Sequence, residues 1–199
     1  SYSTGLENES WVVNYEWTSE LAWISRVLDI QFVYTSSVMV FSQQTEGPFT
    51  IFSKPDCSQG YGYEKRLAEE RVFYQNPQSI VCRLGWQIDT KAGSNNMIDF
   101  LEKQMQYNGH IRASTKWYPA CSFLEDTVKA MYSILMMRPG LYQINSNEKW
   151  SFYEIVNALK ERLKKNWKVS PSEDLIYDQR MLDERVDIPS LRTRLPLQD

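Results

Sequence analysis

The chain has 199 residues, enough for one large domain or for a domain with a smaller lobe. Its formal net charge of −3 does not indicate the excess of basic residues that binding to nucleic acid or to an anionic membrane surface requires. No apolar run approaches the roughly 18 residues that a membrane span needs, and the polar, acidic start is unlike a signal peptide. The composition therefore predicts a globular protein with neither nucleic acid nor membrane as a partner.

Cysteine and histidine usage narrows the chemistry further. Cys57, Cys82 and Cys121 are scattered and odd in number, which predicts free thiols in a reducing, cytoplasmic compartment. His110 is the only histidine, so a multi-histidine zinc site is excluded and a histidine-dependent triad is disfavoured. We expect no metal, and we expect proton chemistry from Tyr, Lys, Asp or Glu.

The first half of the chain alternates helices with short apolar strands. Apolar residues at helical spacing predict a helix over residues 9–28. The β-branched and aromatic run over 30–37 ends in hydroxyls and predicts a buried strand. A loop rich in Gly and Pro covers 42–60, and a helix follows over 61–75. The run over 79–86 predicts a second buried strand.

The second half repeats this alternation. The patterns predict helices over residues 96–107, 122–137 and 151–165 and a strand over 140–145. Ser122 with Glu125 and Ser151 with Glu154 have capping-box spacing. The tail from Pro171 is predicted to be irregular. Alternating strands and helices indicate an α/β fold with a mostly parallel sheet covered on both faces.

Tyr61 and Lys65 open the helix predicted over 61–75. Residues four apart lie on one helix face, so both side chains can point into one cleft. A nearby lysine cation lowers the pKa of a phenol toward the working range of an acid or base. Ser36 and Ser37 end the preceding strand and can supply a hydroxyl to the same site. The alternative is a helix start with a surface ion pair between Lys65 and Glu69.

The combination of these motifs resembles a known family. "YTSSVMVF" is followed, 24 residues after Ser37, by "YGYEKRLAEE", which looks like the serine strand and Tyr-Gly-x-x-Lys helix of the extended short-chain dehydrogenase/reductase superfamily. "VCRLGWQID", "GSNNMIDFL", "SFLEDTVKAM" and "GLYQINSNEKWSFYEIVNAL" resemble later segments of that family in the same order. The likeness covers about residues 12 to 196, and is strongest to dTDP-4-dehydrorhamnose reductases and related sugar-nucleotide reductases.

This resemblance implies a Rossmann-like sheet, an NADP or NAD cofactor and a nucleotide-sugar substrate whose carbonyl is reduced. Catalytic roles are implied for Ser37, which orients the carbonyl, Tyr61, which moves the proton, and Lys65, which lowers the tyrosine pKa. Cofactor contacts are implied for Tyr61, Lys65, Arg83, Leu84 and Gly85. Substrate contacts are implied for Ser37, Trp86 and Asn96.

The match departs from the family at the start of the chain. The eight glycines contain no Gly-x-x-Gly-x-x-Gly turn, so the nucleotide-binding N-terminal third of the family is absent. Residues 1–90 are expected to be the remaining half of a Rossmann-like domain with the catalytic residues. Residues 91–199 are expected to form mainly a substrate-binding lobe, with some segments returning to the sheet. We therefore expect a truncated chain that is inactive alone; the alternative is a non-catalytic regulatory or binding homologue.

A second departure concerns the substrate region. "RASTKWYPACSF" keeps only the position of the family's Asp-Gln-x-Gly-x-Pro-Thr segment, which leaves the sugar open. Trp117 and Tyr118 can stack on a ligand, although core or rim packing is the commoner use of such residues. The helices over 9–28 and 61–75 are candidates for a four-helix face in a homodimer.

Overall fold

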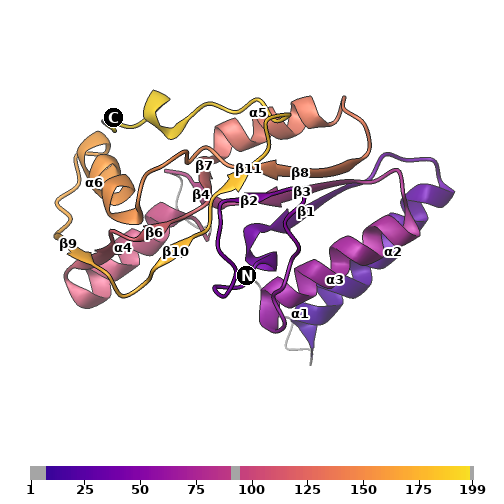
Figure 1. Ribbon diagram of the computed structural model, residues 1–199, viewed down its shortest axis with the longest axis horizontal. Helices are drawn as coiled ribbons and strands as arrows, with labels where there is room; N and C mark the ends of the chain where they lie inside the picture. Colours follow the sequence, from indigo (N-terminus) through magenta and orange to yellow (C-terminus); the bar gives the residue numbers. More distant parts are fainter. Residues whose placement is uncertain (1–7, 91–94, 198–199) are drawn as a thin grey trace.

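A small parallel sheet lies at the centre of the molecule. The computed structural model describes residues 8–90 and 95–197 of the chain. The sheet has the strand order β1-β3-β8 (Figure 1). Its strands are β1 (Val33–Ser37), β3 (Ile80–Leu84) and β8 (Gly140–Ile144). Ser37, Leu84 and Ile144 form the last row of the sheet, so the carboxyl ends of the strands share one edge.

Helices cover both faces of this sheet, as expected for parallel strands (Figure 1). On one face lie α2 (Trp17–Val27) and α3 (Gly60–Gln75), with α1 (Glu9–Trp11) and a π-helical segment, η1 (Val12–Glu16), leading into α2. On the other face lies α5 (Leu124–Ile134). Alternate strand residues enter the two cores, Tyr34 and Val81 beneath α3 and Ile80 and Cys82 beneath α5. The predicted α/β fold is thus confirmed.

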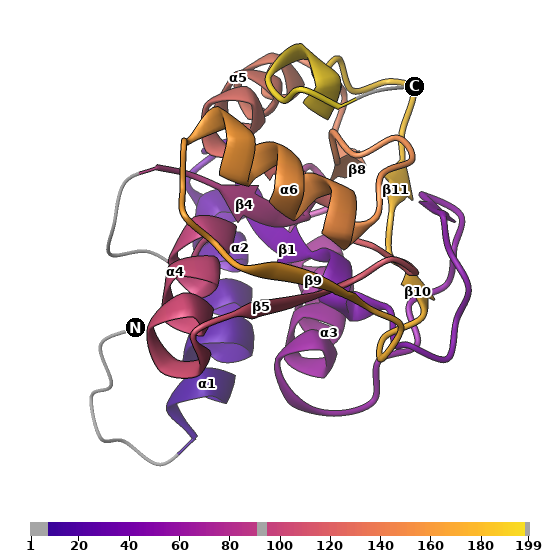
Figure 2. The same cartoon turned by 90° about the vertical axis from the view of Figure 1, so that its left-hand side faces the viewer.

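A second lobe is built around the largest apolar cluster. It contains α4 (Met97–Asn108), α6 (Phe152–Arg162) and the parallel pair β5 (Ile111–Ser114) and β9 (Val169–Ser172). Figure 2 views this lobe from its own side, with β5 and β9 running beside α4 and α6. Leu101, Trp150, Ile155 and Leu159 are fully buried between these elements.

Short parallel strand pairs join the lobe to the sheet. They are β4 (Trp86–Ile88) with β7 (Cys121–Phe123), β6 (Trp117–Tyr118) with β10 (Tyr177–Asp178), and β2 (Phe49–Thr50) with β11 (Met181–Leu182). A 3₁₀ turn, η2 (Val38–Val40), follows β1, and another, η3 (Leu191–Thr193), lies near the C-terminus. The tail after Pro171 therefore pairs with earlier segments, and the prediction of an irregular tail is wrong.

The two predicted capping boxes have different outcomes. At α6 the Ser151 hydroxyl accepts the Glu154 N–H at 3.3 Å and the Glu154 carboxylate accepts the Ser151 N–H at 2.8 Å, which confirms the prediction. At α5 the prediction is wrong. Ser122 lies in β7, where its hydroxyl bonds Thr127 at 2.6 Å, and Phe123 is the N-cap residue. Pairing of β7 with β4 fixes Ser122 in extended backbone before the helix begins.

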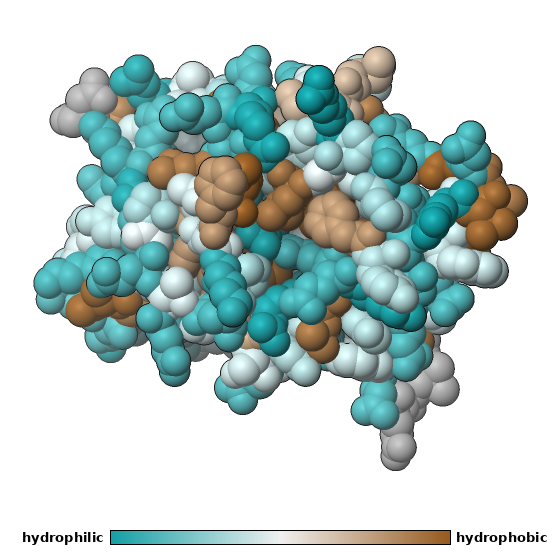
Figure 3. Space-filling view, turned by 45° about the vertical axis from the view of Figure 1, so that its right-hand side comes forward, coloured by the Kyte–Doolittle hydropathy of each residue, from teal (hydrophilic) through white to brown (hydrophobic). Residues whose placement is uncertain are grey.

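Some composition-based predictions can also be compared with the fold. The three cysteines are free thiols, as predicted. Within residues 8–90 and 95–197, no helix has the length and apolar character needed to cross a bilayer. Within the same ranges, no group of His, Cys, Asp or Glu side chains is arranged to hold a metal ion. Apolar side chains reach the surface in separate patches among polar ones (Figure 3).

Candidate active site

Ser37 lies where β1 turns into η2. As the last residue of the strand it has extended backbone, and its hydroxyl accepts the N–H of Met39 at 3.1 Å, which starts the 3₁₀ turn. The Ser37 side chain also lies close enough to the Tyr61 phenol to lower its pKa. The carboxyl edge of the sheet and the start of α3 thus meet at these two side chains, which the sequence predicted as partners.

Gly62 explains how the start of α3 comes so close to β1. A Cβ atom at this position would lie 2.0 Å from the carbonyl oxygen of Met39 and 2.7 Å from Sγ of Cys57. Only a residue without a side chain allows this contact without a backbone shift. The glycine between Tyr61 and Lys65 is therefore required by the packing of α3 on η2, and this packing sets the position of Tyr61.

Lys65 points inward from the next turn of α3 and is only 9% exposed. Its Nζ donates to the carbonyl oxygen of Thr35 at 3.0 Å. It also lies 4.7 Å from the ring centroid of Tyr34 and 5.6 Å from that of Tyr61. The alternative of a surface pair between Lys65 and Glu69 is wrong, because Glu69 is buried and is paired with Arg83.

The environment shifts the pKa values of both candidate catalytic groups. Burial lowers the pKa of Lys65, against the opposing attraction of Glu64 and Glu69. Tyr61 is 43% exposed, and partial burial together with the nearby carboxylate of Glu64 raises its pKa, while the neighbouring Ser37 side chain offsets part of this rise. The pKa of Tyr61 is therefore raised overall, whereas the sequence predicted that it would be lowered. Tyr61 stays protonated at neutral pH, which suits a proton donor.

The residues at the end of β3 and directly after it have clear structural roles. Arg83 donates from Nε and Nη2 to the Glu69 carboxylate, so these atoms serve an internal ion pair. A Cβ at Gly85 would lie 2.5 Å from the backbone of Ala120, to which Trp86 N–H donates at 2.7 Å. Leu84 ends β3 beside Ser37. Contacts of Arg83, Leu84 and Gly85 with a cofactor stay predictions.

Trp86 and Asn96 lie toward the second lobe. Trp86 is half-buried in an aromatic cluster, with its ring centroid 6.1 Å from that of Trp117 and 6.0 Å from that of Phe152. Asn96 is buried and caps α4, its Oδ1 accepting the N–H of Asp99 at 3.0 Å. Their predicted substrate contacts stay predictions, and Trp117 is used here in packing.

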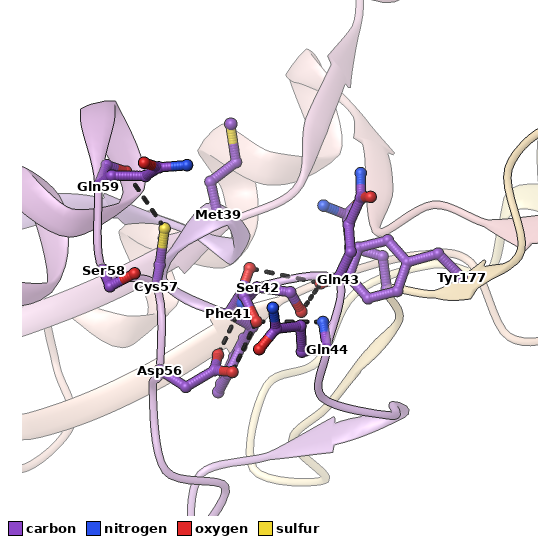
Figure 4. A pocket seen from close by; sticks show the side chains of 11 residues that line it. Met39, Phe41, Ser42, Gln43, Gln44, Asp56, Cys57, Ser58, Gln59 and Tyr177 are labelled. Carbon is purple, nitrogen blue, oxygen red and sulfur yellow. Dashed lines mark hydrogen bonds between the residues drawn. The ribbon is translucent and has the colours of Figure 1, made fainter.

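A pocket of about 470 Å³ opens beside the site. Two loops form it, one following η2 and one preceding α3 (Figure 4). Its lining residues are Met39, Phe41, Ser42, Gln43, Gln44, Asp56, Cys57, Ser58, Gln59, Tyr177 and Gln179. Met39 is two residues from Ser37, and Gln59 is two residues from Tyr61. The pocket lining is therefore close in the chain to these two candidate catalytic residues. Its amides and hydroxyls can donate to and accept from a polyhydroxylated ligand.

Asp56 holds the two loops together. Its carboxylate accepts the Ser42 N–H at 2.7 Å and the Ser42 hydroxyl at 2.6 Å, and the Thr45 hydroxyl also donates to it. Burial opposes ionisation of Asp56, but the hydrogen bonds from Ser42 and Thr45 outweigh it and hold the pKa below its ordinary value. The wall of the pocket is therefore fixed by a charged side chain.

Comparison with known proteins identifies the family. A family model described as the RmlD substrate binding domain matches residues 6–177. The chain belongs to this family. The structure of dTDP-4-dehydrorhamnose reductase from Bacillus anthracis in complex with NADP superposes on this RmlD-type chain with a TM-score of 0.79. The two are 15% identical, and the match covers 92% of this chain and 69% of the reductase.

Two further relatives of this RmlD substrate-binding domain support the same fold. ADP-L-glycero-D-manno-heptose-6-epimerase from Helicobacter pylori has a TM-score of 0.72 and 20% identity, covering 92% of this chain and 62% of the epimerase. The spore coat polysaccharide biosynthesis protein SpsK of Bacillus subtilis is 24% identical over 131 residues. That match covers 66% of this chain and 46% of SpsK, so the chain spans less than half of this relative.

The sequence predicted Ser37, Tyr61 and Lys65 as site residues of this RmlD-type domain, but not the roles of Asp56 and of the Glu69–Arg83 pair. Asp56 lies in a segment whose Gly and Pro content signalled only a loop. The local partners that the sequence offers Glu69 are Lys65 and Arg66, four and three residues away, whereas Arg83 lies 14 residues away on a strand. Charged residues inside an otherwise buried strand are rare. Arg83 in the apolar run "SIVCRLGW" was therefore the feature of the sequence that could have indicated a buried ion pair.

Proposed function

We propose that the chain is the catalytic and substrate-binding part of an NAD(P)-dependent reductase that acts on the carbonyl of a nucleotide-sugar, as in dTDP-4-dehydrorhamnose reduction. The observation that carries this proposal is the meeting of Ser37, Tyr61 and Lys65 at the carboxyl edge of the sheet. The family membership and the reductase, epimerase and related folds among the structural neighbours support it.

The site divides the reaction between three side chains. Ser37 donates a hydrogen bond to the carbonyl oxygen and so holds it next to the Tyr61 phenol. Tyr61 donates its proton to that oxygen as negative charge develops there. Its raised pKa keeps the proton in place until that moment. The Lys65 ammonium lies 5.6 Å from the phenol ring and stabilises the phenolate that proton transfer leaves behind.

A nicotinamide cofactor fits the residues that are present. When bound, this group supplies the hydride for the carbonyl carbon. The buried Lys65 ammonium has three N–H donors, and one of them donates to the carbonyl oxygen of Thr35. The other two are suited to donate to a ribose hydroxyl beside Tyr61. Tyr61, Lys65, Arg83, Leu84 and Gly85 are the proposed cofactor-binding residues, and Ser37, Trp86 and Asn96 the proposed substrate-binding residues.

The function is tested by following NADPH and NADH oxidation with dTDP-4-dehydrorhamnose and with other nucleotide-sugar ketones. The assay uses the full-length product that contains residues 1–199. Tyr61→Phe should lower kcat by about a hundredfold or more, and Ser37→Ala should also lower it. Tyr74→Phe, an exposed tyrosine on the same helix, is the matched control and should be neutral. Cofactor binding without turnover of any sugar would instead indicate the non-catalytic homologue.

We further propose that the protein forms a homodimer through α2 and the turns before and after it. Val13, Trp17, Leu21, Ile24 and Leu28 are spaced by four, four, three and four residues and are each between 40% and 60% exposed. Such a stripe lies on one helix face and is self-complementary about a two-fold axis. Light scattering should give twice the monomer mass, and Leu21→Glu should halve it. Met136→Glu, at an exposed apolar residue away from α2, should not.

The three free thiols support a reducing, cytoplasmic environment for this protein. Burial raises the pKa of the Cys82 thiol to about 12 and that of Cys121 above its ordinary range. Both thiols are therefore protected in the folded state, and Cys57 is the accessible one. A thiol reagent at pH 8 should label Cys57 alone in the native protein and all three cysteines after denaturation.

A further inference from the structure

A buried ion pair lies beneath α3, one helical turn beyond Lys65. The Glu69 carboxylate accepts Nε and Nη2 of Arg83 at 2.9 and 2.7 Å, which makes the pair bidentate. The Ser36 hydroxyl donates to the same carboxylate at 2.6 Å. The side chains of Arg83 and Glu69 are 3% and 7% exposed. These three residues link α3 to β1 and β3 at one point.

This network is a costly way to fill the space under a helix. A buried ion pair rarely exceeds, and often falls below, the stability of well-packed apolar residues of similar volume. Here Nη1 of Arg83 has no hydrogen-bond partner among the described residues. Gln143, which pairs with Arg83 in register on β8, is buried and also leaves both amide atoms without such a partner within the described ranges. Stability alone therefore gives a poor account of this polar row.

The position of the network relative to the site gives a better account. Ser36 immediately precedes Ser37, and Glu69 follows Lys65 by four residues on the same face of α3. Lys65 already bonds β1 at the carbonyl oxygen of Thr35. The helix is thus attached to β1 at two successive turns, through neighbouring residues of the strand. Two attachment points fix both the rotation and the translation of a helix on a strand.

The bidentate geometry makes the second attachment directional. A guanidinium and a carboxylate in fork-to-fork contact tolerate little relative rotation. The Arg83 guanidinium also lies over the ring of Phe41, with Cζ 5.0 Å from the ring centroid. Arg83 itself is anchored in the central strand of the sheet. A shift of α3 along β1 would therefore break this contact before it moved Tyr61 away from Ser37.

We propose that Ser36, Glu69 and Arg83 are positioning residues that fix α3 on the sheet so that Tyr61 and Lys65 meet Ser37. Ser36 and Glu69 have no proposed contact with substrate or cofactor, and Nε and Nη2 of Arg83 are bound by Glu69 rather than by a ligand. The three residues act by holding the proton donor, its cationic neighbour and the carbonyl-orienting hydroxyl in register. The effect on turnover rests on the proposed reductase function, whereas the effect on the distance between Tyr61 and Ser37 does not.

The test separates positioning from stability. In the full-length product, Ser36→Ala, Glu69→Met and Arg83→Met are combined, which removes every charge and donor of the network and keeps similar volume. The melting temperature should be unchanged or higher. The nuclear Overhauser contact between the Tyr61 ring and the Ser37 side chain should weaken or vanish. With substrate, kcat should fall about a hundredfold, as for an ångström-scale misplacement, with KM little changed.

The matched control is the other bidentate pair that joins a helix to a distant segment. Arg194 donates to Asp126 at 2.6 and 2.5 Å, and the Asp126 side chain is 3% exposed. Asp126→Leu combined with Arg194→Met should change the melting temperature without changing the Tyr61–Ser37 contact or kcat. If the network variant behaves like this control and keeps both the contact and kcat, the positioning role is overturned.

A milder variant covers the case in which the triple variant does not fold. Arg83→Lys keeps the positive charge but loses the fork that engages both carboxylate oxygens. It should fold and should weaken the Tyr61–Ser37 contact, and unchanged contact and kcat would overturn the proposal. If the parent protein reduces no nucleotide-sugar ketone, the proposed function fails, but the nuclear Overhauser measurement still decides the positioning role.

Discussion

Helices α3 and α6 each bury five residues, but these residues differ greatly in chemistry. The buried residues of α3 are Gly62, Lys65, Ala68, Glu69 and Val72, and those of α6 are Phe152, Ile155, Val156, Ala158 and Leu159. In α6 the inward face is entirely apolar, and each large side chain contributes roughly 1.5–3 kcal/mol of stability when fully buried. In α3 two of the five buried residues are charged. The buried face of α3 positions the helix on the sheet, whereas the buried face of α6 stabilises the fold.

The two helices also begin differently. The capping box of Ser151 and Glu154 satisfies the first N–H groups of α6 locally. At the start of α3 the N-cap residue, Gln59, makes no side-chain cap, and the backbone at Gly62 touches η2 instead. The beginning of α6 is encoded within four residues. The beginning of α3 depends on a segment more than 20 residues away in the chain.

The largest expected difference comes from removing one member of the charged interior. Glu69→Leu leaves the Arg83 cation buried without its carboxylate, so we expect a loss of about 3–5 kcal/mol in the free energy of unfolding. Urea denaturation measures this loss. Glu70→Leu, at the exposed neighbouring position, should change stability by less than about 0.5 kcal/mol. Equal effects of the two substitutions would mean that the interior of α3 tolerates an unpaired charge.

A cavity in α6 should cost about as much but have no effect on the site. Leu159 is fully buried in the apolar cluster, so Leu159→Ala should lower the free energy of unfolding by about 2–5 kcal/mol. The nuclear Overhauser contact between Tyr61 and Ser37 should stay as in the parent protein. A weakened contact would show that the lobe, rather than the network under α3, determines the position of Tyr61.

The N-cap residues provide a smaller comparison. Ser151→Ala removes a capping box and should cost about 1 kcal/mol in urea denaturation. Gln59→Ala removes a side chain that caps nothing and should cost less than about 0.5 kcal/mol. The reverse order of these two values would contradict the idea that α3 is placed by its backbone contact with η2.

The smallest expected effect is a pH dependence at Tyr61. Its pKa is higher in the folded than in the unfolded protein, so between these values the unfolded chain has lost the proton and the folded one keeps it. Stability should therefore fall as pH rises through about 10 and beyond, where unfolded tyrosines ionise. Tyr61→Phe removes this contribution. The stability of the variant relative to the parent should rise between pH 9 and 11, and a flat difference would refute the burial effect.

The same contrast decides what the sequence could predict. Helix α6 was predicted from its helical spacing of apolar residues, and its start from the capping box of Ser151 and Glu154. Both predictions succeed because these interactions are local in the chain. Tyr61, Lys65 and Ser37 were predicted as site residues from their spacing and from family resemblance. The partner of Glu69 was not found, because Lys65 is nearer in sequence and only the fold brings Arg83 closer. The capping box predicted at Ser122 was wrong for the same reason, since pairing of β7 with β4 overrides the local capping signal.

The strands of the tail were missed because of their size. β10 and β11 have two residues each, which is too short for any alternation of polar and apolar residues to show. What holds them is tertiary: Tyr177 and Met181 enter the cluster around Phe41 and Phe49. Their strand partners are distant in the chain, since Tyr177 pairs with Trp117, 60 residues earlier, and Met181 with Phe49, 132 residues earlier. The preferences of single residues do not encode such pairings.

The contact between Gly62 and Met39 has a consequence for how this domain can diversify. It joins the two ends of the loop that separates Ser37 from Tyr61, and Phe49 and Asp56 anchor that loop on either side of its exposed tip at Phe52. Lengthening a loop whose ends are already joined costs little entropy. The sequence of the tip can therefore change or lengthen while Ser37 and Tyr61 keep their spacing. One loop thus contains both a variable tip and two fixed ends.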